Sequence, residues 1–111
     1  MAFHQSKDAS GVTVVQVDGQ LIVGNRQELK ELVNQALDAG NRKILIDFSR
    51  TGYIDSSGLG ALVALAKRAR EVGGELRLSG LNEDLRSLFE LTKLDTLFAI
   101  ADTPEQALAG F

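Results

Sequence analysis

The stretch Asp55-Ser56-Ser57-Gly58-Leu59-Gly60 lies between a predicted strand and a long apolar run that begins at Leu59. Aspartate and serine are favourable helix N-caps, because their side-chain oxygens accept hydrogen bonds from amide groups that the first turn leaves unpaired. A hydroxyl there lies near the positive end of the helix dipole, which favours an added negative charge by about 0.3–1 kcal/mol. The stretch therefore predicts a helix N-terminus that tolerates a phosphorylated serine.

Gly58 and Gly60 fall near the start of the same predicted helix. Each glycine costs about 1 kcal/mol relative to alanine inside a helix, so a pair of them needs a reason. Glycine lacks a Cβ atom and therefore lets another group approach the backbone closely. We expect such a close approach at this turn.

Strand and helix patterns alternate along the rest of the chain. The β-branched run Val12–Val17 predicts a strand that ends at the turn signal Asp18-Gly19, with residues 3–7 as its hairpin partner. Asn25 and Glu28 predict a capping box at the start of a helix. The other expected elements are strands at 44–48, 75–79 and 97–101 and helices at 57–72, from 82 and from 103. This alternation predicts an α/β layer architecture.

The composition is that of one ordinary globular domain over residues 1–111, with 44% apolar and 24% charged residues. A net charge of −3 with scattered lysines and arginines argues against nucleic-acid binding. The absence of cysteine excludes disulfides and thiolate metal sites. No signal-peptide pattern precedes the domain, and no apolar run reaches the roughly 20 residues of a membrane span. We expect a cytoplasmic protein that does not bind membranes.

An enzymatic role for the serines is not supported by the sequence. The pattern Gly-x-Ser-x-Gly fails at both, since Ile54 and Asp55 stand where its first glycine belongs. Val63 replaces the third glycine of a dinucleotide-binding fingerprint, and no Gly-Lys-Ser/Thr string marks a phosphate-binding loop. The single histidine, His4, is predicted to be an ordinary strand residue. We expect neither catalysis nor a cofactor or metal, and helix capping alone is the simplest interpretation of the two serines.

The stretch 55–60, preceded by Lys43-Ile44-Leu45-Ile46-Asp47-Phe48 and followed by Gly73-Gly74-Glu75-Leu76, resembles the STAS-domain anti-sigma factor antagonists over nearly the whole chain. The resemblance implies a mixed β-sheet with helices packed mainly on one face. It also implies that Ser56 is phosphorylated by a partner that is both serine kinase and anti-sigma factor. Unphosphorylated antagonist then binds this partner and frees the sigma factor, and a phosphoserine phosphatase resets the switch.

The resemblance further implies a partner-binding surface around Ser56. Its expected members are Asp55, Ser57, Gly58, Leu59, Gly60, Leu21, Ile22, Gly24 and Asn25. Asp55 has two expected roles, to position the Ser56 hydroxyl before phosphate transfer and to repel the phosphate afterwards. Many family members carry an aspartate after a Gly-Glu-Leu step, whereas this chain reads Gly19-Gln20-Leu21-Ile22-Val23-Gly24-Asn25, so its surface is less acidic.

Two alternatives remain open from the sequence. Leu59, Ala61 and Leu65 either are buried under the loop 21–25 or form an apolar docking surface beside the serine. The domain itself is either a phosphorylation-switched antagonist or a non-switching scaffold subunit of a signalling or transport assembly, in which the serine motif serves structure only. A third possibility, sensing of a small ligand by the domain, has no sequence feature of its own.

Overall fold

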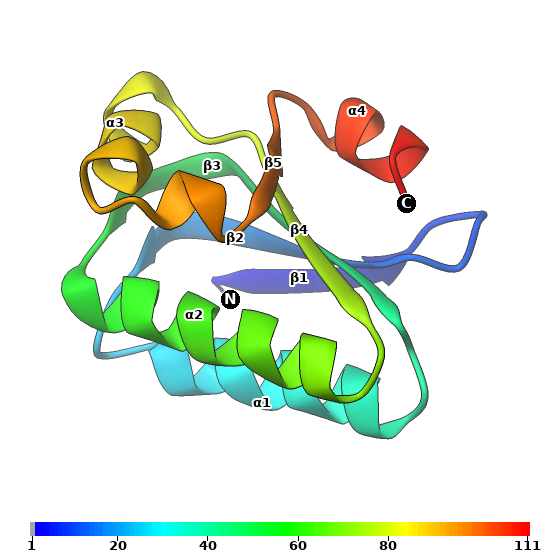
Figure 1. Ribbon diagram of the computed structural model, residues 1–111. Coiled ribbons are helices and arrows are strands. Elements are labelled where there is room, and N and C mark those ends of the chain that lie inside the picture. The colour runs from blue at the N-terminus through cyan, green and yellow to red at the C-terminus, as the bar shows by residue number, and fades with distance from the viewer. Residues whose placement is uncertain (1) are drawn as a thin grey trace.

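A five-stranded mixed sheet forms the centre of the computed structural model, which describes residues 2–111 (Figure 1). The strands lie in chain order, with β1 antiparallel to β2 and every other neighbouring pair parallel. Their bounds are Phe3–Lys7 (β1), Thr13–Leu21 (β2), Lys43–Ile54 (β3), Glu75–Ser79 (β4) and Ala99–Ala101 (β5). The sheet confirms the expected mixed α/β fold.

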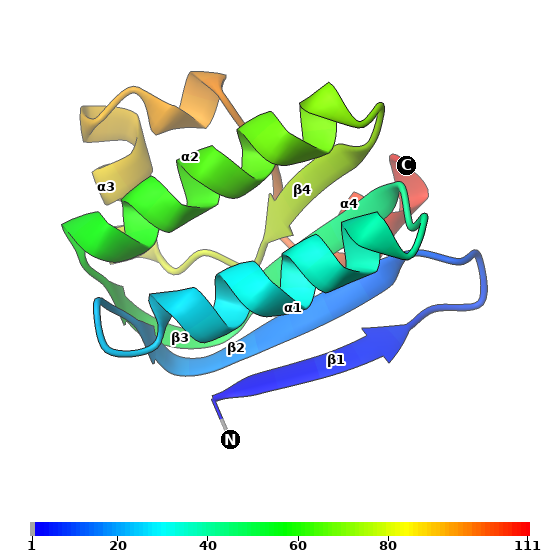
Figure 2. The same ribbon diagram turned by 90° about the horizontal axis from the view of Figure 1, so that it is seen from below.

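Helices cover mainly one face of this sheet, as expected. Their bounds are Arg26–Asp38 (α1), Ser56–Glu71 (α2), Glu83–Leu91 (α3), the 3₁₀ turn Leu94–Thr96 (η1) and Pro104–Ala109 (α4). Figure 2 shows α1 and α2 side by side across the strands, and together with α3 they bury the main core. The short α4 covers the other face, where Ala107 packs with Val12 and Leu45 in a second small cluster.

The central strand β3 is buried on both faces, which explains its nearly unbroken apolar run. Ile44, Ile46 and Phe48 point into the main core, whereas Leu45 belongs to the cluster beneath α4. Side chains alternate between the two faces of a strand, so one apolar sequence serves both cores. β3 then continues through Ile54, further than the predicted end at residue 48, and delivers the chain directly to Asp55.

The prediction that β2 ends at Asp18-Gly19 is wrong. Gly19 has the left-handed φ of +87° that a turn glycine has, but β2 continues to Leu21. The pairing of β2 with β3 shifts register before Asp18 and again after Gly19, so the glycine lies in an irregular stretch of the ladder. The longer strand places Leu21 opposite Ile54, and this brings the loop after β2 to the start of α2.

One helix cap and two element boundaries also differ from the sequence prediction. Asn25 precedes α1 but makes no side-chain cap bond, so the predicted capping box is absent. α2 begins at Ser56, one residue earlier than expected, and the last strand begins only at Ala99. The predicted caps of the later helices are confirmed, because Asn82 accepts a hydrogen bond from Leu85 N and Thr103 accepts one from Gln106 N.

Candidate functional site

Asp55 caps α2 and also holds the loop between β2 and α1. Its Oδ1 atom accepts a hydrogen bond from the Gly58 amide at 2.7 Å, as predicted for an N-cap residue. Its Oδ2 atom accepts a second bond from the Val23 amide at 3.0 Å. One carboxylate therefore joins the first turn of the helix to a loop that precedes it by 32 residues.

The loop that receives Asp55 is itself closed by Asn25. The Asn25 Oδ1 atom accepts a hydrogen bond from the Ile22 amide at 2.9 Å, and its Nδ2 atom donates one to the Gln20 carbonyl at 2.9 Å. These bonds occupy the side chain that the capping box would have used, which explains the missing cap. In addition, the Asp55 amide donates to the Leu21 carbonyl at 3.1 Å. The loop and the helix start therefore form one connected surface.

Ser56 is the first residue of α2 and is exposed to solvent, whereas Ser57 is half-buried. The first turn of α2 contains no acidic residue after the Asp55 cap. Ser56 therefore combines an accessible hydroxyl with the electropositive end of a 16-residue helix and with one neighbouring carboxylate. This is the arrangement that the sequence predicted for the helix start.

Close packing explains why position 58, the first of the two glycine positions, requires glycine. A Cβ atom built on Gly58 would lie 2.5 Å from the Leu21 carbonyl oxygen and 2.9 Å from Ile54 Cγ2. The end of β2 thus approaches the helix backbone as closely as a glycine allows. Gly60 is different: it is exposed, and a Cβ atom there meets nothing within 4 Å in the described part of the chain.

The expected partner-binding residues divide into a surface layer and a supporting layer. Leu21 is fully buried, Leu59 is 9% exposed and Gly58 is buried, so these three support the site from within. Ala61 and Leu65 are buried too, and this decides the open alternative for the apolar start of α2 in favour of burial. The exposed or half-buried members are Asp55, Ser57, Gly60, Ile22, Gly24 and Asn25.

Two apolar side chains at this site were missed by the sequence prediction. Val23 is 63% exposed and its amide binds Asp55, and Tyr53 is 57% exposed two residues before Asp55. The signal for Tyr53 was present, because it alternates with the buried residue Ile54 at the end of β3. For Val23 no periodic signal exists, since it lies in a loop. Val23 thus lies in the loop that Asp55 holds, and Tyr53 lies on β3 just before Asp55.

The single histidine of the chain lies on β1 rather than at the start of α2. The His4 ring on β1 lies 3.0 Å from the Asp18 carboxylate and is engaged there. Within residues 2–111, no group of three or more potential metal ligands is found. No helix in that part of the chain is long and apolar enough to cross a membrane.

A family comparison gives the geometry its context, since the STAS domain family matches residues 5–107. The chain belongs to the STAS domain family. It is 32% identical to BtrV of Bordetella bronchiseptica, named as an anti-sigma factor antagonist, over 90% of this chain and 93% of that one. It is also 32% identical to the anti-sigma-B factor antagonist of Staphylococcus aureus, over 82% of this chain and 84% of that one.

Solved structures of STAS proteins share this fold. A protein of Thermotoga maritima named as an anti-sigma factor antagonist superimposes with a TM-score of 0.90 at 28% identity, over 97% of this chain and 92% of that one. The Bacillus cell fate determinant SpoIIAA in its phosphorylated form gives a TM-score of 0.76 at 23% identity, over 97% of both chains. The STAS chain described here thus has relatives that are named as anti-sigma factor antagonists.

Proposed function

We propose that this STAS protein is a phosphorylation-switched anti-sigma factor antagonist. Unphosphorylated at Ser56, it binds a serine-kinase anti-sigma factor and thereby releases a sigma factor. The observation that carries the proposal is the position of Ser56, an exposed hydroxyl on the first residue of α2 and next to the Asp55 carboxylate. Named relatives that are anti-sigma factor antagonists support it.

The switch acts on binding rather than on folding. In the free protein a phosphate on Ser56 stays in water and faces the helix N-terminus, which favours negative charge. In a complex the same phosphate must lose water and lie close to Asp55, a like charge. Phosphorylation therefore leaves the fold intact and weakens the complex.

Asp55 extends the effect of the phosphate to the neighbouring loop. Its carboxylate holds both the Gly58 and the Val23 amides, so repulsion by a phosphate on Ser56 acts on the bond to the loop as well as on the helix. The proposed docking surface contains Ser57, Gly60, Ile22, Gly24 and Asn25 together with the exposed Val23 and Tyr53. Leu21, Gly58 and Leu59 hold it from beneath.

The proposed partners follow from this chemistry. A serine kinase that is also the anti-sigma factor supplies the phosphate, and a phosphoserine phosphatase removes it. The end of β2 and the loop after it carry Gln20 and Ile22 where many family members are more acidic, so we expect this kinase to rely less on basic residues at that contact. The switch operates in the cytoplasm, where sigma factors act.

Phosphorylation of the purified protein tests the proposal. Each candidate serine kinase from the same genome is incubated with the protein and ATP, and modified residues are located by mass spectrometry. We expect phosphate on Ser56 with one kinase, which the unphosphorylated protein also binds. If no kinase modifies Ser56, the non-switching scaffold becomes the better account, and the Asp-Ser-Ser stretch serves helix capping alone.

A further inference from the structure

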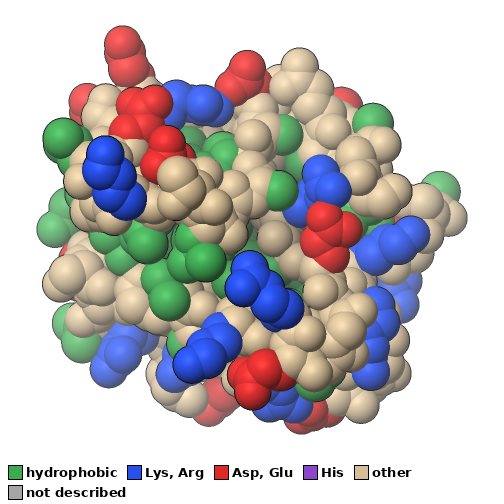
Figure 3. Space-filling view, in the orientation of Figure 1, with side chains coloured by type: hydrophobic (Ala, Val, Ile, Leu, Met, Phe, Trp, Pro, Cys, Tyr) green, Lys and Arg blue, Asp and Glu red, His purple; other side chains and the backbone are tan. Residues whose placement is uncertain are grey.

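A groove runs between α2 and the segment that joins η1 to β5, apart from the Ser56 site. Two adjoining hollows of about 190 Å³ each make up the groove, and both are lined by Arg70 and Leu97. Val63 and Lys67 line one hollow, and Ala66 and Leu76 line the other. Figure 3 shows hydrophobic side chains gathered between these elements, with lysine and arginine side chains on the α2 rim.

The shortness of β5 leaves this groove open. β5 pairs only with Arg77–Ser79 of β4, so the first two residues of β4 have no strand on that side. Val63 and Ala66 on α2 are half-buried against the core, and Leu97 remains 37% exposed. The apolar side chains that line the groove are therefore Val63, Ala66, Leu76 and Leu97, and no element of the described chain, residues 2–111, covers the groove.

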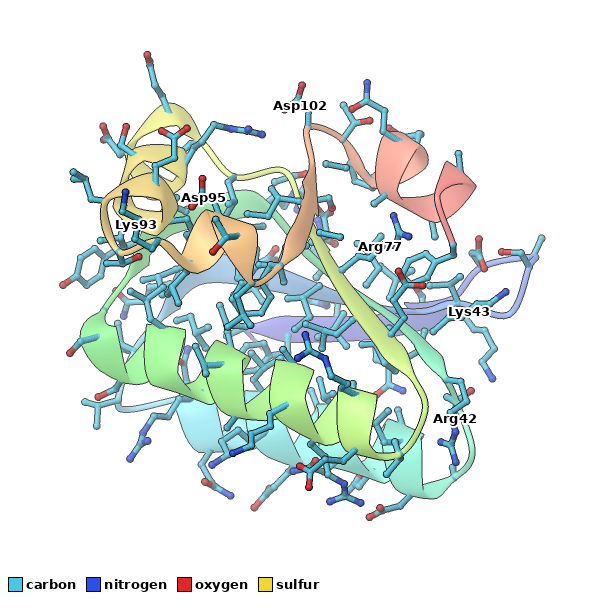
Figure 4. The ribbon with its side chains drawn as sticks, in the orientation of Figure 1. Arg42, Lys43, Arg77, Lys93, Asp95 and Asp102 are labelled. Atoms are coloured by element: carbon cyan, nitrogen blue, oxygen red, sulfur yellow. The ribbon has the colours of Figure 1, made fainter. Side chains whose placement is uncertain are left out.

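The charge that lines the groove is positive. Lys67 and Arg70 form no salt bridge within residues 2–111, whereas Arg68 on the same helix binds Asp38 at 2.7 Å. Glu75 also lines the groove, but its carboxylate lies 2.7 Å from Arg77. Figure 4 labels this Arg77 on β4, where its guanidinium also lies 4.9 Å from the centre of the Phe111 ring.

We infer that the groove docks an acidic amphipathic helix of a partner protein. Two apolar side chains one turn apart would fill the two hollows, and carboxylates beside them would face Lys67 and Arg70. Along α2, Ala66 of one hollow follows Val63 of the other by three positions, a rise of about 4.5 Å. Residues i and i+4 of a bound helix are separated by a similar rise of roughly 6 Å. Apolar anchors at this spacing are typical of helices bound in grooves.

This site is separate from the phosphorylation switch. Ser56 and Arg70 stand 14 residues apart on α2, a rise of about 21 Å. The groove can therefore bind its helix whether or not Ser56 is modified, and its occupation links the STAS domain to a second protein. This protein has a net charge of −3, so the positive rim is a local feature of the groove. We expect this rim to favour an acidic helix over a basic one.

A peptide titration tests the inference. The probe is a synthetic amphipathic helix with leucines at i and i+4 flanked by glutamates, and its twin carries lysines in place of the glutamates. Amide shifts of the ¹⁵N-labelled protein are followed by NMR. We expect the acidic peptide alone to shift the amides of Lys67, Arg70 and Leu97.

Matched variants then assign the charge. The double variant Lys67→Glu, Arg70→Glu should bind the acidic peptide at least about tenfold more weakly, whereas Arg68→Glu, outside both hollows, should change the affinity less than twofold. Ser56→Asp should leave it unchanged, which separates this test from that of the switch. The inference would be overturned if the lysine peptide bound as tightly as the acidic one, or if millimolar acidic peptide left the amide shifts of the groove residues unchanged. A dimer that forms with rising concentration and is abolished by Leu97→Glu would overturn it in favour of a second copy.

Discussion

The Asp55 carboxylate accepts a hydrogen bond from the Val23 amide at 3.0 Å, and this bond joins the start of α2 to the loop after β2. The other carboxylate oxygen caps the helix through Gly58. An N-cap side chain accepts its hydrogen bond from an amide in the first turn of its own helix. Here one side chain next to the exposed Ser56 also binds a loop distant in sequence, so we expect charge placed on Ser56 to act on both elements.

Removal of this carboxylate should destabilise both elements. We expect Asp55→Ala to lower the free energy of unfolding by about 1–2 kcal/mol, the upper part of the range for loss of an N-cap. Chemical denaturation measures it. The control is Thr103→Ala, which removes a single capping bond from α4. Hydrogen exchange of the Val23 amide should accelerate only in Asp55→Ala, and unchanged exchange there would show that the loop does not depend on Asp55.

The two glycines of the motif should respond in opposite ways to alanine. Gly58→Ala forces a methyl group against the Leu21 carbonyl at 2.5 Å, so we expect a loss of about 1–3 kcal/mol in stability from overpacking. Gly60→Ala has open space and should be neutral or stabilising by up to about 1 kcal/mol. Thermal unfolding measures the stability of the two variants, and equal stability of both would contradict the observed packing.

Gly60→Ala should separate stability from partner binding. Its added methyl group points from an exposed position of α2 into the proposed docking surface, where it would keep a closely packed partner away. We therefore expect weaker binding to the kinase partner without any loss of fold stability. Unchanged affinity would mean that Gly60 lies outside the contact and serves only the local turn.

The sequence predicts this fold well where periodicity is strong and poorly where two signals compete. The apolar run 44–48 predicts a strand that the structure shows within β3, and the buried side chains of α1, Leu29, Val33, Ala36 and Leu37, recur at helical spacing. Asp18-Gly19 predicts a turn because Asp-Gly favours a left-handed φ, but the same φ also fits an irregular strand ladder. Asn25 has the right residue type for a cap, yet its side chain closes the loop instead.

The candidate site was predicted in outline only. The position of Ser56 at a helix start followed from local capping rules. The bond from Asp55 to Val23 could not be predicted, because it depends on how far β2 extends before the loop begins. The burial of Leu21 has the same cause, since its carbonyl and side chain lie against Gly58 in the first turn of α2.

The adjacent serines provide an internal control for phosphorylation. Both lie near the same helix N-terminus, but Ser56 is exposed and Ser57 is half-buried. We expect the kinase partner to modify wild-type protein and Ser57→Ala, and to leave Ser56→Ala unmodified. If mass spectrometry located the phosphate on Ser57 of the wild-type protein, the assignment of the switch to Ser56 would be wrong.

The most direct test of the switch compares Ser56→Ala with Ser56→Asp in calorimetric titrations against the kinase partner. Aspartate carries about one negative charge and phosphoserine about 1.5–2, so the aspartate should reproduce part of the effect. We predict that Ser56→Ala binds like the unphosphorylated protein, that Ser56→Asp binds more weakly, and that both unfold at the wild-type temperature. Equal affinity of the two variants, with unchanged unfolding temperatures, would contradict the account, because charge at this position would then not control binding.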